Sequence, residues 1–307
     1  MFEKLIEKLQ DGSWLTLETS PSKSASFQPI IDKIAALGLD KKVDGWSVTD
    51  NPLAQLRYGS IFAAIRLQAA FNKPAIATIG MRDRNLIAIQ SDILGCNEAG
   101  VRAFLAVTGD PASLSDQPRA KGVFEANSVE FLKIAHFFNR GIDYAGKTIF
   151  PAPKPIYPFA VCNSRAKNAA TLKRKFAQKI GAGAIGVISQ PVFSLEDARA
   201  LQRLFNEVAC EFEDDRKNAR LILGVFPLSR LKTAQFLQSR VPGIRVSDRW
   251  IDALFEANRK GAQEEAKVGY EMSAELLRSI RRDKTPVHIM SANHFELADR
   301  LIDEIRL

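Results

Sequence analysis

Asp110 stands where a short apolar run turns abruptly polar. The run Phe104 to Val107 is followed by Thr-Gly-Asp-Pro, and this order predicts a buried parallel strand that opens into a tight turn. In an α/β barrel or sheet, ligands bind at the carboxyl ends of the strands, where the loops converge. An Asx turn that merely ends a strand would also explain Asp110. The functional interpretation gains weight because other predicted strands also end in polar side chains.

These other polar side chains come from positions far apart in the chain. They are Glu18, Thr49, Asp50, Asn163, Gln190 and His288. If the strands form a closed barrel, all of them share one pocket with Asp110. The carboxyl groups of Glu18 and Asp110 would suit acid–base catalysis. The sequence shows no Ser-His-Asp order, which argues against hydrolysis of that type. The pattern does not fix the register of each strand, so it does not decide which side chains point inward.

Eight short runs with strand character alternate with helical runs. The predicted strands are Trp14–Thr19, Val43–Val48, Ala75–Ile79, Ala103–Val107, Phe159–Cys162, Ile185–Ser189, Leu221–Phe226 and Val287–Met290. This arrangement in 307 residues favours an α/β fold, a (β/α)8 TIM barrel in which residues 1–307 form one domain. A doubly wound sheet is the alternative. Gly181, Gly183 and Gly186 match the spacing of a dinucleotide-binding loop, but they follow a helix and enter a strand, which is the reverse order.

The composition is that of an ordinary folded protein, with 46% hydrophobic and 25% charged residues. The net charge of +8 is spread along the chain, with small clusters on predicted helices at Lys173–Lys175 and Arg281–Lys284. Such clusters are usually solvated helix faces, and no nucleic-acid-binding module is present in the sequence. A small molecule that carries phosphate or carboxylate groups would explain the charge more simply than DNA. The N-terminus lacks a secretory signal and no apolar run approaches the ~20 residues that span a bilayer, so we expect a cytoplasmic protein with no membrane partner.

Cysteine and histidine usage gives no sign of a metal centre. Cys96, Cys162 and Cys210 lie far apart in predicted helices or strands, and this favours reduced, buried thiols over disulfides. The chain has only three histidines and no His-Cys cluster, so we expect no zinc site.

Six stretches occur in a definite order between the first strand and the last. They are Val48-Thr-Asp-Asn-Pro52, Arg82-Asp-Arg-Asn85, Leu105-Ala-Val-Thr-Gly-Asp-Pro111, Ala182-Gly-Ala-Ile-Gly-Val-Ile-Ser-Gln-Pro191, Gly224-Val-Phe-Pro-Leu228 and Val287-His-Ile-Met290. Together with Glu18, this ordered set resembles the successive motifs of the methylenetetrahydrofolate reductase family. The resemblance implies an eight-stranded barrel that binds FAD non-covalently and passes a hydride from NADH or NADPH to a folate.

The resemblance also implies roles for single residues. Glu18 matches the family's acid, which protonates a folate nitrogen so that the imidazolidine ring opens to an iminium cation. A carboxyl group in a closed, partly apolar pocket can keep such a proton near neutral pH. Asp110 matches the aspartate beside the flavin and the pterin, where its charge disfavours an anionic reduced flavin and favours a cationic substrate. Gln190 matches a residue that contacts folate or nicotinamide in turn, and Thr233 and His294 are further candidates on the folate side.

Other positions match the family's flavin contacts or their neighbours. They are Thr49, Asp50, Thr78, Thr108, Gly109, Phe124, Glu125, Phe159, Asn163 and Lys179, with Asp110 serving both cofactor and substrate. By this resemblance, Lys179 would offer its charge to the pyrophosphate of FAD.

Several of these positions depart from the family's usual residues. Thr78 stands where many members carry His, and Thr108 replaces a common Arg. Glu125 and Leu172 stand where small and acidic residues are usual, and His294 stands where an Arg often meets the folate. A second hypothesis therefore stays open beside the reductase. It is a barrel that binds flavin or folate as a subunit of a larger complex and receives its electrons from a partner protein. A homo-oligomer is a further possibility.

Overall fold

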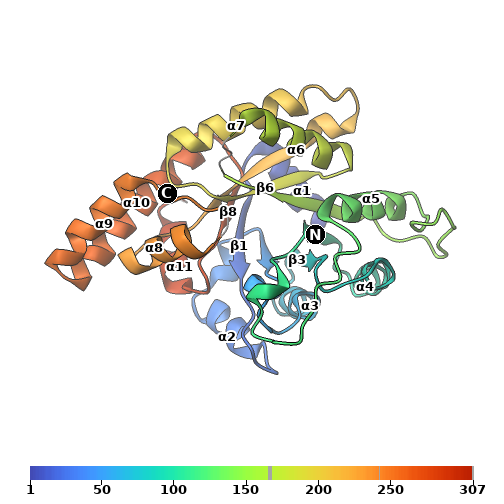
Figure 1. Ribbon diagram of the computed structural model, residues 1–307, viewed down its shortest axis with the longest axis horizontal. Coiled ribbons are helices and arrows are strands. Elements are labelled where there is room, and N and C mark those ends of the chain that lie inside the picture. The colour runs from blue at the N-terminus through green and yellow to red at the C-terminus, as the bar shows by residue number, and fades with distance from the viewer. Residues whose placement is uncertain (165–167, 242, 306–307) are drawn as a thin grey trace.

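Eight parallel strands form the centre of the molecule (Figure 1). The structure is a computed structural model that describes residues 1–164, 168–241 and 243–305. The strands are β1 (Leu15–Thr19), β2 (Gly45–Val48), β3 (Ala75–Gly80), β4 (Ala103–Val107), β5 (Tyr157–Cys162), β6 (Gly186–Pro191), β7 (Arg220–Val225) and β8 (Val287–Ile289). Each strand pairs with the next, and β8 pairs with β1, so the barrel is closed. The predicted (β/α)8 barrel is therefore confirmed, and the alternative of an open doubly wound sheet is wrong.

Eleven α-helices surround the strands in the described part of the chain. They are α1 (Phe2–Asp11), α2 (Gln28–Ala36), α3 (Ser60–Phe71), α4 (Leu86–Glu98), α5 (Ser128–Asn139), α6 (Ala169–Gly181), α7 (Leu195–Ala209), α8 (Leu231–Arg240), α9 (Asp248–Lys260), α10 (Ala262–Arg282) and α11 (Phe295–Asp303). Short 3-10 helices follow strands or helices at η1 (Leu39–Lys41), η2 (Pro52–Ala54), η3 (Ala112–Leu114) and η4 (Asp215–Asn218). The helices cover the outer face of the strands, which explains why strands such as β3 are buried along their whole length.

The fifth strand begins earlier than the sequence pattern predicts. β5 starts at Tyr157 instead of Phe159, although Pro158 has no N–H to donate. The carbonyl group of Pro158 still accepts a hydrogen bond from the N–H of Ile185 at 2.9 Å. A proline fits into a strand when only its carbonyl group is needed for a hydrogen bond. The sequence does not show whether the N–H of that residue would be needed.

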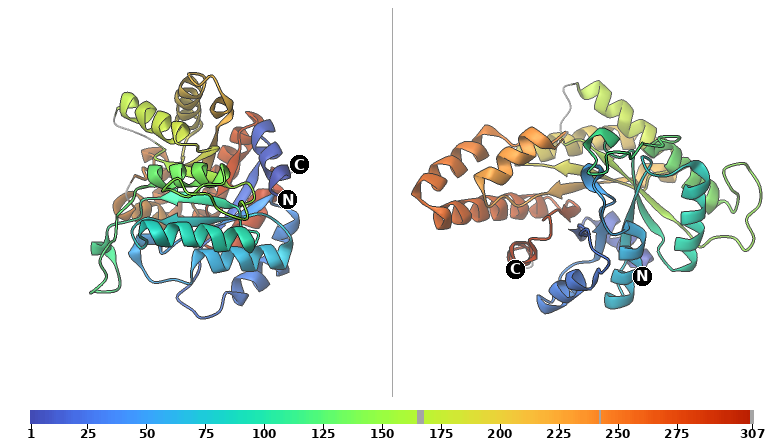
Figure 2. Two further views of the ribbon diagram at one scale, coloured as in Figure 1. Left: turned by 90° about the vertical axis from the view of Figure 1, so that its right-hand side faces the viewer. Right: turned by 60° about the horizontal axis from the view of Figure 1, so that its bottom comes forward.

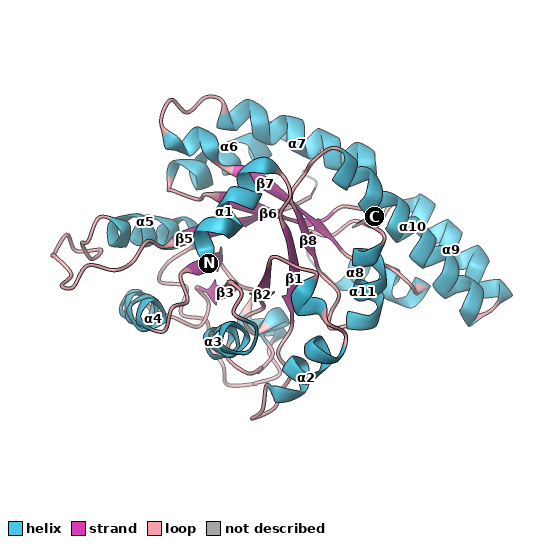
Figure 3. Cartoon of the chain, turned by 180° about the vertical axis from the view of Figure 1, so that it is seen from behind, coloured by secondary structure: helices cyan, strands magenta, loops and turns pink. Residues whose placement is uncertain are grey.

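The interior of the barrel is filled by apolar side chains, and one end is closed by α1. The interior cluster contains Ile76, Phe159 and Ile188, and α1 adds Phe2 and Leu9 to the same cluster. Figure 3 shows α1 lying in front of the strands when the molecule is seen from behind. This end of the barrel is therefore filled, and the opposite end, where the strands have their carboxyl termini, is the one at which polar residues accumulate.

Three helices lie between β7 and β8, and α8 and α9 contribute to a small core apart from the barrel's, whereas most buried residues of α10 pack with the barrel. Leu228, Leu237, Trp250 and Leu254 belong to an apolar cluster that is separate from the barrel's. Figures 1 and 2 show α9 and α10 running outward from the barrel as an antiparallel pair.

The three cysteines differ in exposure. Cys96 and Cys162 are buried as expected, and burial raises the pKa of each thiol to about 12. Cys210 is exposed, contrary to the prediction of a buried thiol, because it lies at the carboxyl end of α7 instead of on its inner face.

We expect iodoacetamide to modify Cys210 in the folded protein near neutral pH and to leave Cys96 and Cys162 unmodified. The thiolate is the reacting form, and burial suppresses it at the two inner positions. Peptide mass spectrometry measures the modification at each cysteine, and the same reaction in denaturant should modify all three. Rapid labelling of Cys162 in the folded protein would show that the end of β5 is open to solvent.

Candidate functional site

The side chains that point into the barrel can be identified from one contact across it. The rings of Trp14 and Phe159 lie 5.5 Å apart, although β1 and β5 are opposite each other in the ring of eight strands. Both side chains therefore point inward. Because side chains alternate along a strand, Thr16 and Glu18 lie on the same inner face as Trp14. Glu18 is the last inward-facing residue of β1, and it is closest to the carboxyl end of the barrel.

Glu18 has a histidine neighbour on β8. Its Oε2 atom lies 3.8 Å from Nε2 of His288, and its side chain keeps 20% of its surface exposed. His288 is 1% exposed, and its Nδ1 atom lies 2.8 Å from Oγ1 of Thr16, its partner in the register between β1 and β8. Glu18 is therefore partly open at the mouth, and its carboxyl group faces the buried ring of His288 at 3.8 Å, which is longer than a hydrogen bond. This is an arrangement in which a carboxyl group can exchange a proton with a ligand.

The Asp110 carboxylate holds the segment that follows β2. Its Oδ2 atom accepts a hydrogen bond from the N–H of Leu53 at 2.8 Å. Asn51, Leu53 and Ala54 all have positive φ angles, a conformation that non-glycine residues adopt only when their surroundings impose it. Asp110 thus has a structural role in shaping the rim of the barrel, in addition to the role beside a cofactor that the sequence predicts.

Asp50 is part of a buried ion pair. Its Oδ2 atom accepts from Nη1 of Arg84 at 2.6 Å and from the N–H of Gly80 at 3.0 Å, and its side chain is 2% exposed. Burial opposes the charge on Arg84, but Asp50 and Asp92 together outweigh this effect and raise the pKa of the guanidinium group. The carboxylate that was predicted to contact a cofactor is engaged in joining the ends of β2 and β3.

Arg82 is a buried residue to which the sequence assigned no individual role. It is 4% exposed, forms an ion pair with Asp83, and donates to the backbone carbonyl groups of Asn51 and Asp110. The hydrogen bond with Asp83 is the main reason that the pKa of Arg82 is raised. The alternating charges of Arg82-Asp-Arg at a predicted strand end were the only local signal of this network. Its partners in the other loops are distant in sequence and could not be identified from it.

Gly109 is required by its conformation and by a close approach. Its φ angle is +92°, and a Cβ atom at this position would lie 2.9 Å from Cβ of Arg82. The turn Thr108–Asp110 therefore packs directly against Arg82, and Gly109 is partly buried there. The neighbouring residue Thr108 is exposed, so its hydroxyl group is available at this part of the rim.

The remaining predicted residues differ in how accessible they are. Thr78 and Phe159 are buried, and Phe159 lies in the interior cluster below the mouth. Lys179 donates to the carbonyl oxygen of Val161, and burial lowers the pKa of its ammonium group. Glu125 accepts from the N–H of Leu86 at the start of α4. The side chain of Thr49 donates to Oγ of Ser20 at the end of β1.

Five other predicted residues take no part in the hydrogen bonds and ion pairs given above. They are Phe124, Asn163, Gln190, Thr233 and His294, which belong to segments at or after the carboxyl ends of β4 to β8. Phe124, Asn163 and His294 are exposed, whereas Gln190 and Thr233 are partly buried. Gln190 lies at an irregular step of β6, between Ile188 and Pro191. All five therefore lie in segments that leave the same end of the barrel as Glu18 and Asp110.

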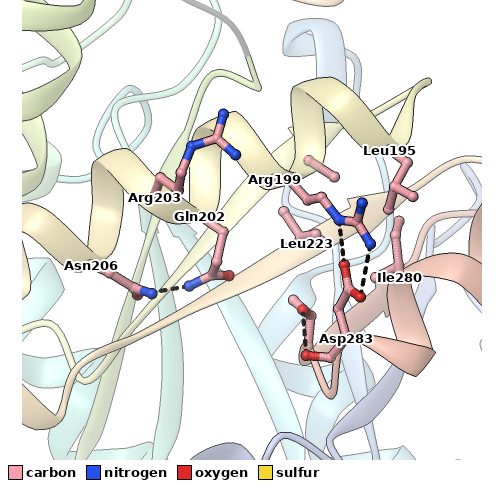
Figure 4. A pocket seen from close by; sticks show the side chains of 10 residues that line it. Leu195, Arg199, Gln202, Arg203, Asn206, Leu223, Ile280 and Asp283 are labelled. Atoms are coloured by element: carbon pink, nitrogen blue, oxygen red, sulfur yellow. Dashed lines mark hydrogen bonds and ion pairs between the residues drawn. The ribbon is translucent and has the colours of Figure 1, made fainter.

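Two cavities elsewhere contain none of the predicted site residues. A cavity of about 200 Å³ lies between α7 and α10, and Figure 4 shows its wall, including the ion pair of Arg199 with Asp283. A wider hollow of about 1130 Å³ lies at the amino ends of β6 and β7, beside His136 and Arg216. Among the described residues, no group of three or more His, Cys, Asp or Glu side chains could hold a metal ion, and no helix is long and apolar enough to cross a membrane.

The closed parallel barrel and its polar carboxyl mouth define the protein as a TIM barrel with a candidate active site in the usual position for that fold. The family model for methylenetetrahydrofolate reductase matches residues 2–306, and the chain belongs to this family. Membership of the family supports a folate-related reductase, and so an oxidoreductase.

Comparison with solved structures confirms the fold. An uncharacterized protein from Clostridium thermocellum, which binds two copies of 5-methyl-5,6,7,8-tetrahydrofolic acid, has a TM-score of 0.64 and 13% identity, with 99% of this chain and 98% of that chain covered. EDTA monooxygenase (EmoA) from Chelativorans sp. has a TM-score of 0.58 and 11% identity, with 95% and 92% covered. DmoA from Hyphomicrobium sulfonivorans has a TM-score of 0.57 and 9% identity, with 95% and 87% covered. A search of the curated proteins found no match.

Proposed function

We propose that this protein reduces 5,10-methylenetetrahydrofolate to 5-methyltetrahydrofolate, with FAD as cofactor and NADH or NADPH as donor. Donor and folate would bind in turn at one site, in a ping-pong reaction. The observation that carries the proposal is the position of Glu18 on the inner face of β1, partly exposed at the mouth of a barrel that belongs to the reductase family. The folate bound to the Clostridium thermocellum protein, which shares the fold, adds support for the substrate class.

In this proposal Glu18 is the acid. It would protonate a nitrogen of the imidazolidine ring, so that the ring opens and the methylene carbon becomes an iminium carbon that can accept a hydride. The carboxylate of Asp110 would favour this cation by its charge. Gln190, Thr233 and His294 are the candidates for orienting the folate.

The rim between β2 and β4 is the region that fits a flavin. The residue Thr108 is exposed there, and its hydroxyl group could donate or accept a hydrogen bond. Thr49 and Asn163 are the other candidates at the mouth. A bound flavin would supply the hydride transfer that protein side chains cannot perform. Lys179 already gives one of its three N–H groups to the carbonyl oxygen of Val161, so the remaining two are the ones that could meet the pyrophosphate.

Binding of flavin and its reduction test the proposal directly. We expect the purified protein to be yellow or to become so with FAD, and we expect NADH or NADPH to bleach the flavin in anaerobic stopped-flow mixing. Addition of methylenetetrahydrofolate should then restore the colour. A colourless protein that takes up no flavin would contradict the proposal.

The second candidate is a flavin- or folate-binding subunit that receives electrons from a partner protein. The departures from the family's usual residues at the predicted cofactor positions Thr78 and Thr108 keep it open. Flavin that is bound but not bleached by either nicotinamide, and is bleached by a reduced electron-transfer protein, would support this candidate. The cytoplasmic location and a homo-oligomeric state stay predictions.

A further inference from the structure

Trp14 donates a hydrogen bond at the start of a buried chain that leads to Glu18. Its indole Nε1 lies 3.0 Å from Oγ1 of Thr16, which is the hydroxyl group beside His288. Trp14 and Thr16 are fully buried. The chain therefore begins in the closed interior of the barrel and ends at the one member that is partly exposed at the mouth.

The chemistry of the indole group fixes the direction of this chain. An indole N–H donates and has no acceptor atom, so Thr16 must accept from Trp14. The hydroxyl group has one hydrogen, and among the described residues Nδ1 of His288 is the acceptor in its reach. If Nδ1 carried a proton instead, the hydrogen of Thr16 would be buried without an acceptor, which folded proteins avoid. A neutral His288 then has its proton on Nε2, the nitrogen that faces Glu18.

We propose that Trp14 sets the direction of this chain, so that His288 presents an N–H group to Oε2 of Glu18. Trp14 is a positioning residue, because it acts on Glu18 only through Thr16 and His288. Nε2 lies 3.8 Å from Oε2, which is longer than a hydrogen bond, so the N–H group acts on the carboxyl group as a dipole that favours the orientation with Oε1 toward the bound molecule. The consequence for catalysis rests on the proposed function, whereas the direction of the hydrogen bonds does not.

The chain offers a matched control in Trp46. This tryptophan is equally buried, but its Nε1 atom has no hydrogen-bond partner among the described residues. Its ring packs against Phe71 of α3, 5.4 Å away, on the outer side of the barrel. Trp46→Phe therefore removes the same group as Trp14→Phe without changing the chain that ends at Glu18.

Nitrogen-15 NMR of histidine-labelled protein near neutral pH tests the proposal. The chain has only three histidines, so His136→Gln and His294→Gln assign the signals of His288 by elimination. We expect the signals of the Nε2–H tautomer for His288 in the wild type and in Trp46→Phe. In Trp14→Phe the hydroxyl group of Thr16 is free to turn, and the Nδ1–H tautomer should gain a measurable population. The same variant should slow folate reduction several-fold and leave flavin reduction unchanged.

Two results would overturn the proposal. One is an Nδ1–H tautomer of His288 in the wild type, and the other is a spectrum of Trp14→Phe that matches that of Trp46→Phe. If Trp14→Phe does not fold, Thr16→Val replaces it, because valine has nearly the shape of threonine. The Nδ1 signal should then move to that of an acceptor without a hydrogen bond, and an unmoved signal contradicts the chain. Failure to bind flavin would refute the proposed function and leave these spectra as they are, so the two failures can be told apart.

Discussion

In Glu18→Gln, we expect folate reduction to fall by about 10²- to 10⁴-fold, the range that a general acid contributes to a reaction. Glutamine keeps the size of the side chain and an oxygen atom that can face Nε2 of His288, but it has no proton to give as an acid. Reduction of the flavin by the nicotinamide should continue, since that step needs no acid to open a folate ring. Anaerobic stopped-flow measurement of the two half-reactions separates the effects.

Glu130→Gln is the control for this variant. Glu130 lies on α5, outside the barrel, and accepts a hydrogen bond from the hydroxyl group of Tyr144. The same chemical change there should leave both half-reactions at the wild-type rate. Equal loss of both half-reactions in Glu18→Gln would mean that the residue supports flavin binding. Survival of both would mean that another group is the acid.

In Arg84→Met, we expect the free energy of unfolding to fall by about 3–5 kcal/mol, the usual cost of leaving one member of a buried ion pair without its partner. The variant would leave the side chain of Asp50 buried, with the N–H of Gly80 as its hydrogen-bond donor among the described residues and the charge of Arg82 farther away. Chemical denaturation followed by fluorescence or circular dichroism measures the change.

Arg199→Met is the matched control for Arg84→Met. Arg199 pairs with Asp283 through two hydrogen bonds, but the two side chains are 55% and 35% exposed. Exposed pairs contribute about 0–1 kcal/mol, so this variant should unfold almost like the wild type. The double variant Asp50→Asn with Arg84→Met should recover part of the lost stability, because it removes the uncompensated charge. A loss of less than about 1 kcal/mol in Arg84→Met would show that solvent reaches Asp50.

The ion pair of Asp50 also affects how the predicted cofactor site is interpreted. The end of β2 was expected to face a cofactor, and one of its carboxylate oxygens instead holds β3 and the segment after it. If Arg84→Met folds but no longer takes up flavin, the pair shapes the cofactor site indirectly. The rim would then have two requirements, a stable join between β2 and β3 and a glycine at position 109 that lets the turn pack against Arg82.

Local sequence patterns determined the elements and therefore the class of fold. Apolar runs of four to six residues, such as Ala103–Val107, separated by amphipathic helices, are compatible with few arrangements other than a closed parallel barrel. The ordered motifs likewise determined the family, because each occupies a strand end and together they span the chain. These features depend on neighbouring residues, which is why they can be read without knowledge of the fold. The sequence pattern did not predict the early start of β5. Pro158 argued against a strand there, but in the structure it only accepts a backbone hydrogen bond and so fits into the strand.

Only the tertiary structure decided how each polar strand end is used. The ring of His288 lies beside both Glu18 and Thr16, and His288 and Thr16 are 272 residues apart in the sequence. Asp50, which follows β2, pairs with Arg84, which follows the neighbouring strand β3. Phe159 is buried against Trp14 and does not reach the mouth. Such contacts depend on the register and closure of the barrel, and a shift of one residue would turn each side chain to the other face. The sequence by itself determined that polar groups gather at one end of a barrel, whereas the geometry of the closed barrel decided which of them stay available for chemistry.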